Sequence, residues 1–397
     1  MRQKLIPIIT LIVLIIILSG CWSRTELDEM AIATAIGIDK REEDYLVTVQ
    51  ILNPGEIAGK AVTTRSEVVT YRTTGKTLFE ALRKLTTEIP RKIYVAHVRI
   101  IIFGEELAKE GIGKSLDLIS RDHEFRTDFF ILVAKDIEST EVLNVLTPIE
   151  KIPANKIYGS LQASEETWAT TKAVTLDELI TNLTSPGSNP VLSGVEMIGD
   201  SQIGMDIGNV EKVDPPASLN LMGLSVFKKD KLVGWLSQEE SKGYNFIKGN
   251  VKSTVDYVAC EEGTIAIEVI KTTSDVKGKV ENGLPKIDIQ INAEANIGEV
   301  QCGKDITKPE IIKELEQQFS DKTKKLINNS IKKVQEDFQS DIFGFGEAIH
   351  RSNSKAWKDL KENWDQEFSN VEVSVKVKYE IRRIGTTKES FQDEKEE

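Results

Sequence analysis

The chain has 397 residues, of which 40% are hydrophobic and 29% are charged, and its formal net charge is −12. This length allows two or three domains, and the composition is typical of a soluble globular body. The acidic balance argues against a nucleic-acid partner, because neutralising phosphates requires clustered Lys and Arg.

The first residues have the features of a secretory signal peptide. Arg2 and Lys4 precede an almost unbroken apolar run over residues 5–18. This run of about 14 residues is short for a transmembrane helix, which needs roughly 20. We therefore expect residues 1–20 to be a signal peptide, and an uncleaved anchor is the weaker alternative.

The end of this signal has the pattern of a bacterial lipoprotein. Leu18-Ser19-Gly20-Cys21 places small residues directly before a cysteine. In this pattern the thiol takes a diacylglyceryl group and the cysteine becomes the new N-terminus. We expect Cys21 to be the lipidation site. Trp22 is then a candidate for the membrane interface, where aromatic rings with a polar edge are favoured.

Residues 21–184 alternate between strand-like and helix-like segments. Apolar alternation and runs of Val and Ile predict strands, and apolar residues at helical spacing predict helices. Such alternation buries a sheet under helices, so we expect an N-terminal α/β domain. Strands are expected near 31–38, 45–50, 67–72, 95–103 and 127–134, and helices near 75–88, 105–108, 113–120, 140–146 and 157–183.

Residues 185–240 are expected to form a linker and a strand-rich middle segment. Ser185-Pro186-Gly187-Ser188-Asn189-Pro190 is the clearest cluster of structure-breaking residues in the chain. Strands are expected at 191–198 and 218–227, followed by a hairpin that reaches Trp235. The segment either completes the first domain or forms a small domain of its own.

Residues 241–385 are expected to form a C-terminal domain of antiparallel strands packed with a long helix. Strands are expected near 249–259, 264–273 and 285–296, and a last one over 371–381. The long helix should run from Pro309 to about Ile342, which at 1.5 Å per residue is about 50 Å. The whole chain is thus a multi-domain protein of mixed α/β and α+β class. Residues 386–397 are polar and acidic, and we expect a disordered tail.

We find no catalytic constellation in the sequence. The histidines His97, His123 and His350 lack metal-ligand spacing, and no Gly-x-Ser-x-Gly elbow is present. We therefore expect no catalytic residue, no metal and no cofactor. Cys260 and Cys302 either form a disulfide or remain two small buried thiols.

Two aromatic features allow a structural or a functional interpretation. Trp357 and Trp364 repeat at helical spacing, which favours burial in a core over a groove for a partner. The Phe343-Gly344-Phe345-Gly346 segment has neither dinucleotide-binding nor Walker spacing, so we interpret it as a break between two helices.

Several segments resemble one known family. They are Cys21 to Lys40, His97 to Glu105, Arg121-Asp122-His123-Glu124, Met222 to Lys228 with Leu232 to Leu236, and Phe343 to Gly346 with Trp357 and Trp364. Together they resemble the Ger(x)C spore germination lipoproteins, the C subunits of germinant receptors, over nearly the whole mature chain.

The resemblance implies a lipid-anchored, non-enzymatic receptor subunit on the outer face of the spore inner membrane. Its partners would be the membrane lipid and the membrane-embedded A and B subunits, and we expect little or no direct binding of nutrient. One alternative is a solute-binding lipoprotein that delivers a nutrient to a transporter, which should show two similar lobes. Another is a secreted hydrolase, which should show a nucleophile with its base.

Overall fold

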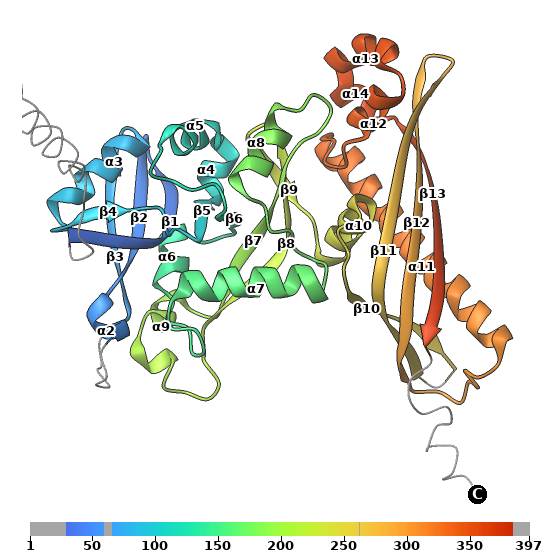
Figure 1. The fold of residues 1–397 in the computed structure, drawn as a ribbon, viewed down its shortest axis with the longest axis horizontal. Coiled ribbons are helices and arrows are strands. Elements are labelled where there is room, and N and C mark those ends of the chain that lie inside the picture. The colour runs from blue at the N-terminus through green and yellow to red at the C-terminus, as the bar shows by residue number, and fades with distance from the viewer. Residues whose placement is uncertain (1–28, 59–65, 262, 384–397) are drawn as a thin grey trace, which may run out of the picture.

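The computed structural model describes residues 29–58, 66–261 and 263–383, which form two β-sheets with helices packed around them (Figure 1). Cys21, Trp22 and the expected tail over 386–397 lie outside the described residues. No helix in the described part of the chain is long and apolar enough to cross a membrane.

The N-terminal sheet has nine strands in the order β3-β2-β1-β5-β6-β7-β8-β9, and β4 pairs with the first residues of β1. β1, β5, β6 and β7 run parallel, whereas β2, β3, β8 and β9 pair antiparallel with their neighbours. The strands are β1 (Met30–Arg41), β2 (Asp44–Leu52), β3 (Val68–Gly75), β4 (Lys92–Tyr94), β5 (Ile100–Gly104), β6 (Phe130–Ala134), β7 (Val191–Ile198), β8 (Ser218–Lys228) and β9 (Lys231–Trp235).

Helices cover both faces of this sheet, as expected for an α/β region. One apolar cluster joins the sheet to α3, α4, α5 and α8, and another joins its opposite face to α6 and α7. The helices are α2 (Pro54–Ala58), α3 (Leu78–Lys84), α4 (Glu105–Glu110), α5 (Gly113–Arg121), α6 (Ser139–Asn144), α7 (Pro153–Thr167), α8 (Leu176–Thr184) and α9 (Ser201–Gly204).

The strands of the middle segment belong to the N-terminal sheet. β7 pairs with β6, and β8 and β9 extend the sheet to its far edge. The sequence left open whether residues 185–240 complete the first domain or form a domain of their own. In the structure their strands complete the first sheet.

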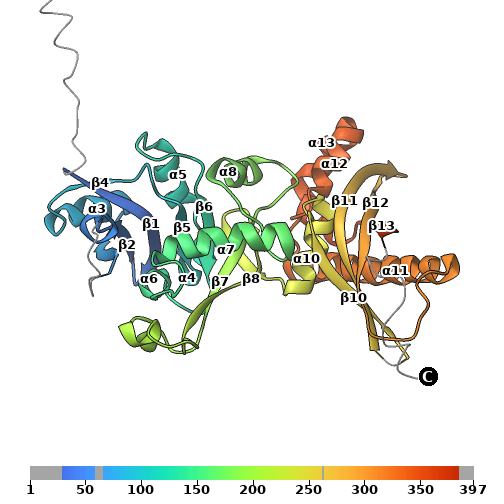
Figure 2. The same cartoon turned by 60° about the horizontal axis from the view of Figure 1, so that its bottom comes forward.

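The C-terminal sheet has four strands in the order β10-β11-β12-β13. They are β10 (Thr254–Cys260), β11 (Gly263–Glu281), β12 (Leu284–Val300) and β13 (Glu372–Arg383). The first three are antiparallel, as expected, but β13 pairs parallel to β12. Figure 2 shows this sheet and the N-terminal sheet at opposite ends of the molecule.

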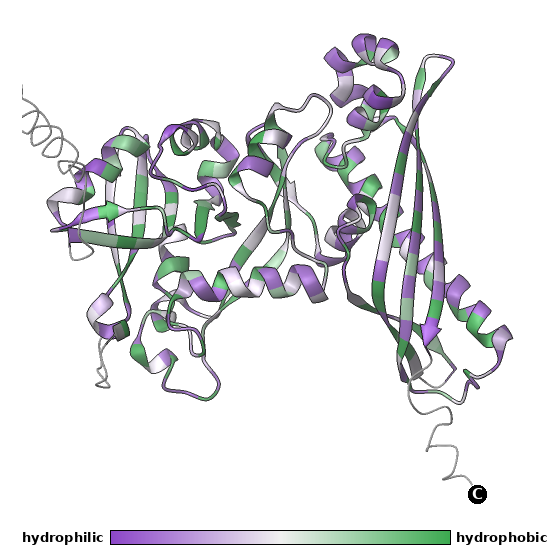
Figure 3. Ribbon diagram, viewed as in Figure 1, coloured by the Kyte–Doolittle hydropathy of each residue, from purple (hydrophilic) through white to green (hydrophobic). Residues whose placement is uncertain are grey.

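Alternating side chains bury one face of this sheet. In β12 the isoleucines Ile287, Ile289 and Ile291 are at most 1% exposed, and the polar residues between them face solvent. Figure 3 shows this alternation as green and purple bands along the long strands. Since the period is two, the pattern in the sequence specifies which face meets the helices.

The helix packed on that face is shorter than the sequence predicted. α11 (Pro309–Lys333) continues only as a π-turn over Val334–Phe338, and Gln339 has a φ of +49°. A residue with left-handed backbone angles commonly ends a helix. The expectation of a continuous helix to Ile342 was therefore wrong, and residues 340–344 are a buried loop.

Short helices replace the single second helix expected after this loop. They are α12 (Phe345–Ser352), α13 (Ser354–Leu360) and α14 (Trp364–Ser369). α10 (Gln238–Lys248) was not expected from the sequence, and the strand before Gly104 is shorter than expected, because residues 95–99 form a turn in which only Val95 and Val98 are buried. α10 had a local signal, since Ser237 and Glu240 form a capping box and Gly249 ends the helix.

Candidate functional site

Two of the segments that carry the family resemblance meet at Asp39, because Gly104 lies directly against its carboxylate. This carboxylate is 2% exposed and accepts hydrogen bonds from Ser139 N (2.8 Å), Ser139 Oγ (2.6 Å) and Thr140 N (3.3 Å) at the start of α6. Burial raises the pKa of Asp39, although the bonds from Ser139 and Thr140 oppose the rise. A side chain at Gly104 would place its Cβ 2.1 Å from Asp39 Oδ1, so the close approach requires glycine.

A second contact joins the start of α4 to β9 through Glu105. Its Oε1 accepts a hydrogen bond from Trp235 Nε1 (3.1 Å), and its Oε2 accepts one from Asp136 N (3.0 Å). These bonds lower the pKa of Glu105 even though burial opposes them. The Glu105 carboxylate therefore connects distant parts of one sheet.

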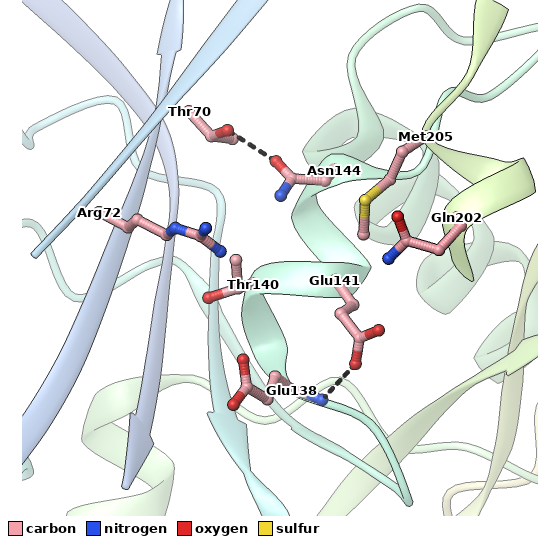
Figure 4. A pocket seen from close by; sticks show the side chains of 8 residues that line it. All are labelled: Thr70, Arg72, Glu138, Thr140, Glu141, Asn144, Gln202 and Met205. Atoms are coloured by element: carbon pink, nitrogen blue, oxygen red, sulfur yellow. Dashed lines mark hydrogen bonds between the residues drawn. The ribbon is translucent and has the colours of Figure 1, made fainter. Parts of the chain in front are cut away.

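A polar pocket of about 520 Å³ lies beside α6 (Figure 4). Thr70 donates a hydrogen bond to Asn144 Oδ1 (2.6 Å), and Glu141 Oε2 accepts one from Glu138 N (3.1 Å). Arg72 points into the same space from β3. Its lining is completed by Thr140, Gln202 and Met205. The pocket offers hydrogen bonds and charges of both signs, but it holds no nucleophile paired with a base.

A second buried carboxylate, Asp341, organises the loop between α11 and α12. It accepts backbone N–H bonds from Phe343 (3.1 Å), Gly344 (2.9 Å), Phe345 (3.2 Å) and Gly346 (2.8 Å). Trp364 Nε1 also donates to it, at 2.9 Å. The Phe-Gly-Phe-Gly segment is therefore a loop wrapped around a carboxylate, and the phosphate-loop interpretation has no support in this geometry.

The tryptophan pair belongs to the core, as the sequence analysis favoured. Trp357 is 2% and Trp364 4% exposed, and their rings meet edge to face with centroids 5.1 Å apart. Phe345 and Phe368 lie in the same cluster. The stripe is therefore not an open groove.

The two remaining cysteines lie together at the end of the C-terminal sheet. Cys260 and Cys302 are joined by a disulfide with Cα atoms 6.5 Å apart, across a sequence separation of 42. Their half-buried side chains pack against the main apolar cluster.

The histidines do not assemble into a site. His97 contacts the ring of Tyr94, His123 is 93% exposed, and His350 stacks on Trp357. Across residues 29–58, 66–261 and 263–383, no group of three or more His, Cys, Asp or Glu could hold a metal ion.

An apolar groove of about 530 Å³ opens between two loops of the N-terminal region. Ile149 and Val213 at its rim are fully exposed, and Leu146 and Leu219 line it. Lys156 also lines the groove, and its amino group donates to the carbonyl of Leu219. Burial lowers the pKa of Lys156. Sequence reasoning missed this surface because the loops are separated by more than 60 residues.

Two family models match the chain. One, for the N-terminal domain of spore germination proteins, matches residues 23–197. The other, described as spore germination B3/GerAC like, C-terminal, matches residues 222–385. Together they cover both sheets.

Curated relatives match the chain over nearly its full length. Spore germination protein KC of Bacillus subtilis (strain 168) is 31% identical over 397 residues, which is 97% of each chain. Spore germination protein A3 of the same organism is 24% identical and covers 96% of this chain and 98% of its own. A crystal structure of the GerBC protein aligns with a TM-score of 0.54 at 18% identity, over 87% of this chain and 96% of that one. At that identity the alignment shows a shared fold.

Proposed function

The chain belongs to the Ger(x)C family of spore germination proteins, and on that premise we propose that it is the lipid-anchored, non-catalytic C subunit of a nutrient germinant receptor. Cys21 would carry the lipid on the outer face of the spore inner membrane, with Trp22 at the interface. The subunit would act through contacts with the membrane-embedded A and B subunits.

The observation that carries this proposal is the match to spore germination protein KC over 97% of both chains. The lipoprotein pattern at Cys21 supports the anchor. Stable attachment of a protein takes two acyl chains rather than one, which a diacylglyceryl group supplies. The absence of a nucleophile paired with a base among the site residues described above supports a non-catalytic role.

A solute-binding lipoprotein remains the second candidate, because the polar pocket beside α6 offers charges of both signs. Two observations weigh against it. The two sheets differ in topology, whereas solute-binding proteins have two similar lobes around a cleft. The pocket also lies on one side of a single sheet rather than between lobes.

Replacing the lipid-bearing thiol tests the anchor. Cys21→Ala should abolish diacylglyceryl attachment, because only a thiol is the nucleophile of that modification, and the protein should leave the membrane fraction or keep its signal peptide. Fractionation of spores with labelling by an alkynyl fatty acid measures this. Cys302→Ala, which removes a different cysteine, should keep the label. A Cys21→Ala protein that is processed and membrane-bound like wild type would show that this cysteine does not anchor the chain.

Calorimetry separates the two candidate functions. We expect no saturable heat when amino acids or sugars are titrated into the purified protein in detergent, because its role is to contact other proteins. Micromolar binding of one nutrient would contradict this and favour solute delivery. Arg72→Ala, which removes the cation of the polar pocket, should then weaken the binding if the nutrient lies there.

A further inference from the structure

The apolar groove beside α7 is formed in part by two loops that leave large apolar side chains in water. Ile149 lies between α6 and α7, and Val213 lies between α9 and β8. Both side chains are fully exposed, although both belong to the lining of the groove. With a volume of about 530 Å³, the groove has the size of a typical pocket for a small organic ligand.

A single ammonium group lies in the wall of this groove. Lys156, in the first turn of α7, is half-buried, and its Nζ donates to the carbonyl of Leu219 in β8. An ammonium has three N–H donors, and within the described part of the chain Leu219 is the only hydrogen-bond partner of this one. Burial alone lowers the pKa of Lys156, and no neighbouring carboxylate in that part of the chain raises it. The charge of Lys156 therefore lacks a counter-ion among the described residues.

The acidic residue in the lining, Glu150, does not neutralise this ammonium. Glu150 is exposed, and it is its backbone carbonyl that accepts the hydrogen bond from Thr147. The neighbouring Lys151 lies outside the lining and is paired with Glu67. The groove thus combines apolar walls with one partly buried cation that has unused donors. Such a combination suits a ligand with an apolar body and an anionic group.

Gly159 leaves further space in the groove. It lies in the middle of α7, where glycine destabilises a helix relative to alanine because it loses more backbone freedom on folding. Its packing does not require glycine, since an added Cβ would meet no atom of the described residues within 4 Å. Residues three apart share a helix face, so Gly159 and Lys156 line the groove together. The missing side chain leaves room that the described part of the chain does not fill, which points to an occupant from outside it.

We propose that this groove binds an apolar monocarboxylate, such as a fatty acid, with its carboxylate on Lys156 and its alkyl chain along Leu146 and Val213. The ammonium keeps its bond to the carbonyl of Leu219 and donates its other N–H groups to the carboxylate. The alkyl chain covers the apolar side chains at the rim, and removing their surface from water stabilises the complex. This binding goes beyond the proposed receptor role. Amino acids and sugars do not fit the groove, because its apolar walls cannot bond their ammonium or hydroxyl groups.

Binding of octanoate, used below its micellar concentration, tests the proposal. Fluorine NMR of 8-fluorooctanoate with the full-length protein in a neutral detergent should show saturable binding above the background of detergent alone. Octanol and octylammonium have the same chain but offer no anion to Lys156, so each should displace the probe at least about tenfold less well than octanoate. Equal displacement by octanol would mean a neutral apolar occupant and would overturn the anionic class. The absence of saturable binding would overturn the proposal and leave the groove to a protein segment.

Removal of the charge tests the position of the carboxylate. Lys156→Met keeps an unbranched side chain in the wall but removes the ammonium, so it should weaken octanoate binding by about tenfold or more and leave octanol binding unchanged. Lys151→Met is the matched control, because Lys151 lies outside the lining, and it should bind octanoate like wild type. Equal octanoate affinity of Lys156→Met and wild type would overturn the assignment of the carboxylate to Lys156.

Filling the groove tests its location without unfolding the protein. Gly159→Leu should melt at the same temperature as wild type or higher, because leucine is the better helix former and the space beside Gly159 is open. The added side chain should nevertheless abolish octanoate binding. Ala163→Leu, which adds the same side chain to an exposed position of α7 outside the lining, should bind like wild type. A folded Gly159→Leu protein that binds octanoate as tightly as wild type would show that the ligand lies elsewhere and would overturn the proposal.

Discussion

Asp341 is a carboxylate without contact to solvent, held in a loop by backbone and indole N–H groups. Desolvation disfavours its charged form, whereas the surrounding donors favour it. The desolvation is the larger effect and raises the pKa of Asp341 to about 6 from 3.8. The folded state therefore binds this proton more tightly than the unfolded state does.

This shift makes stability depend on pH. The contribution of Asp341 is fully present below about pH 4 and is lost as pH rises through 6, and a difference of this size between the folded and unfolded pKa is worth about 3 kcal/mol. Asp341→Asn should be less stable than wild type, because its amide cannot accept all the N–H bonds, but it lacks this titration. The stability gap between the two proteins should therefore narrow from pH 4 to pH 7.

Urea unfolding at pH 4.5 and pH 7 measures the gap. Asp359→Asn, which changes an exposed acid on α13, serves as the control and should follow wild type at both pH values. A gap that widens with rising pH would mean that the N–H donors outweigh desolvation at Asp341.

The long hairpin of β11 and β12 depends on one close approach. Asn282 and Gly283 form the turn of this hairpin. Both have a positive φ, which a two-residue hairpin turn requires. Further along β11, an added Cβ at Gly278 would lie 2.6 Å from Ile349 N and 2.7 Å from the carbonyl carbon of Ala348. α12 therefore packs directly on the strand backbone.

Gly278→Ala should destabilise the C-terminal region by about 1–3 kcal/mol, because backbone atoms of α12 must move to admit a methyl group. Chemical denaturation followed by tryptophan fluorescence reports this, since Trp357 and Trp364 lie in the same core. The control is Gly298→Ala in β12, where the nearest atom is 3.8 Å from the added Cβ. Equal stability of the two variants would show that the helix adapts at little cost.

Polar contacts join the two sheets, beside an apolar cluster to which Val191, Leu224 and Val226 of the first sheet also belong. Asn189 N donates to Asp341 O (2.6 Å), Ser340 Oγ donates to Phe227 O (2.6 Å), and Ser185 Oγ donates to a carboxylate oxygen of Glu347. A cleft of about 920 Å³ opens beside these bonds. The breaker cluster at residues 185–190 is thus a contact between the two regions as well as a connection within the first.

Gly187 is a point of close approach in that junction between the two sheets. Its φ is +91°, and an added Cβ would lie 2.6 Å from the Trp357 ring and 2.8 Å from Gly346 Cα. Gly187→Ala should lower the free energy of unfolding by more than the roughly 1 kcal/mol expected for the positive φ alone, because the junction must also open. Thermal unfolding should show an earlier or split transition.

Gly283→Ala is the matched control for the junction, since its φ is +81° and an added Cβ meets nothing within 4 Å. Gly283→Ala should therefore lower the free energy of unfolding only by the amount expected for an alanine at a positive φ. If both variants unfold alike, the contact between Gly187 and Trp357 adds no stability to the junction.

Much of this protein follows from local sequence patterns. The expected signal peptide and the Leu-Ser-Gly-Cys motif are contiguous in the sequence, and the segments that resemble Ger(x)C proteins can be recognised from the sequence alone. The period of two in β12 specifies a half-buried strand, and Ser237, Glu240 and Gly249 would have revealed α10 by capping chemistry. These signals are local because hydrogen bonds and solvent exposure repeat along the chain with fixed periods.

Other features depended on contacts between residues far apart in the chain. Which sheet receives β7 to β9, the parallel direction of β13 and the end of α11 at Gln339 follow from packing among distant segments. The partner of Asp39 is 100 residues away, and the donors around Asp341 include Trp364. The sequence does not distinguish a buried aspartate from an exposed one. Only the folded chain determines whether water or N–H groups surround the carboxylate.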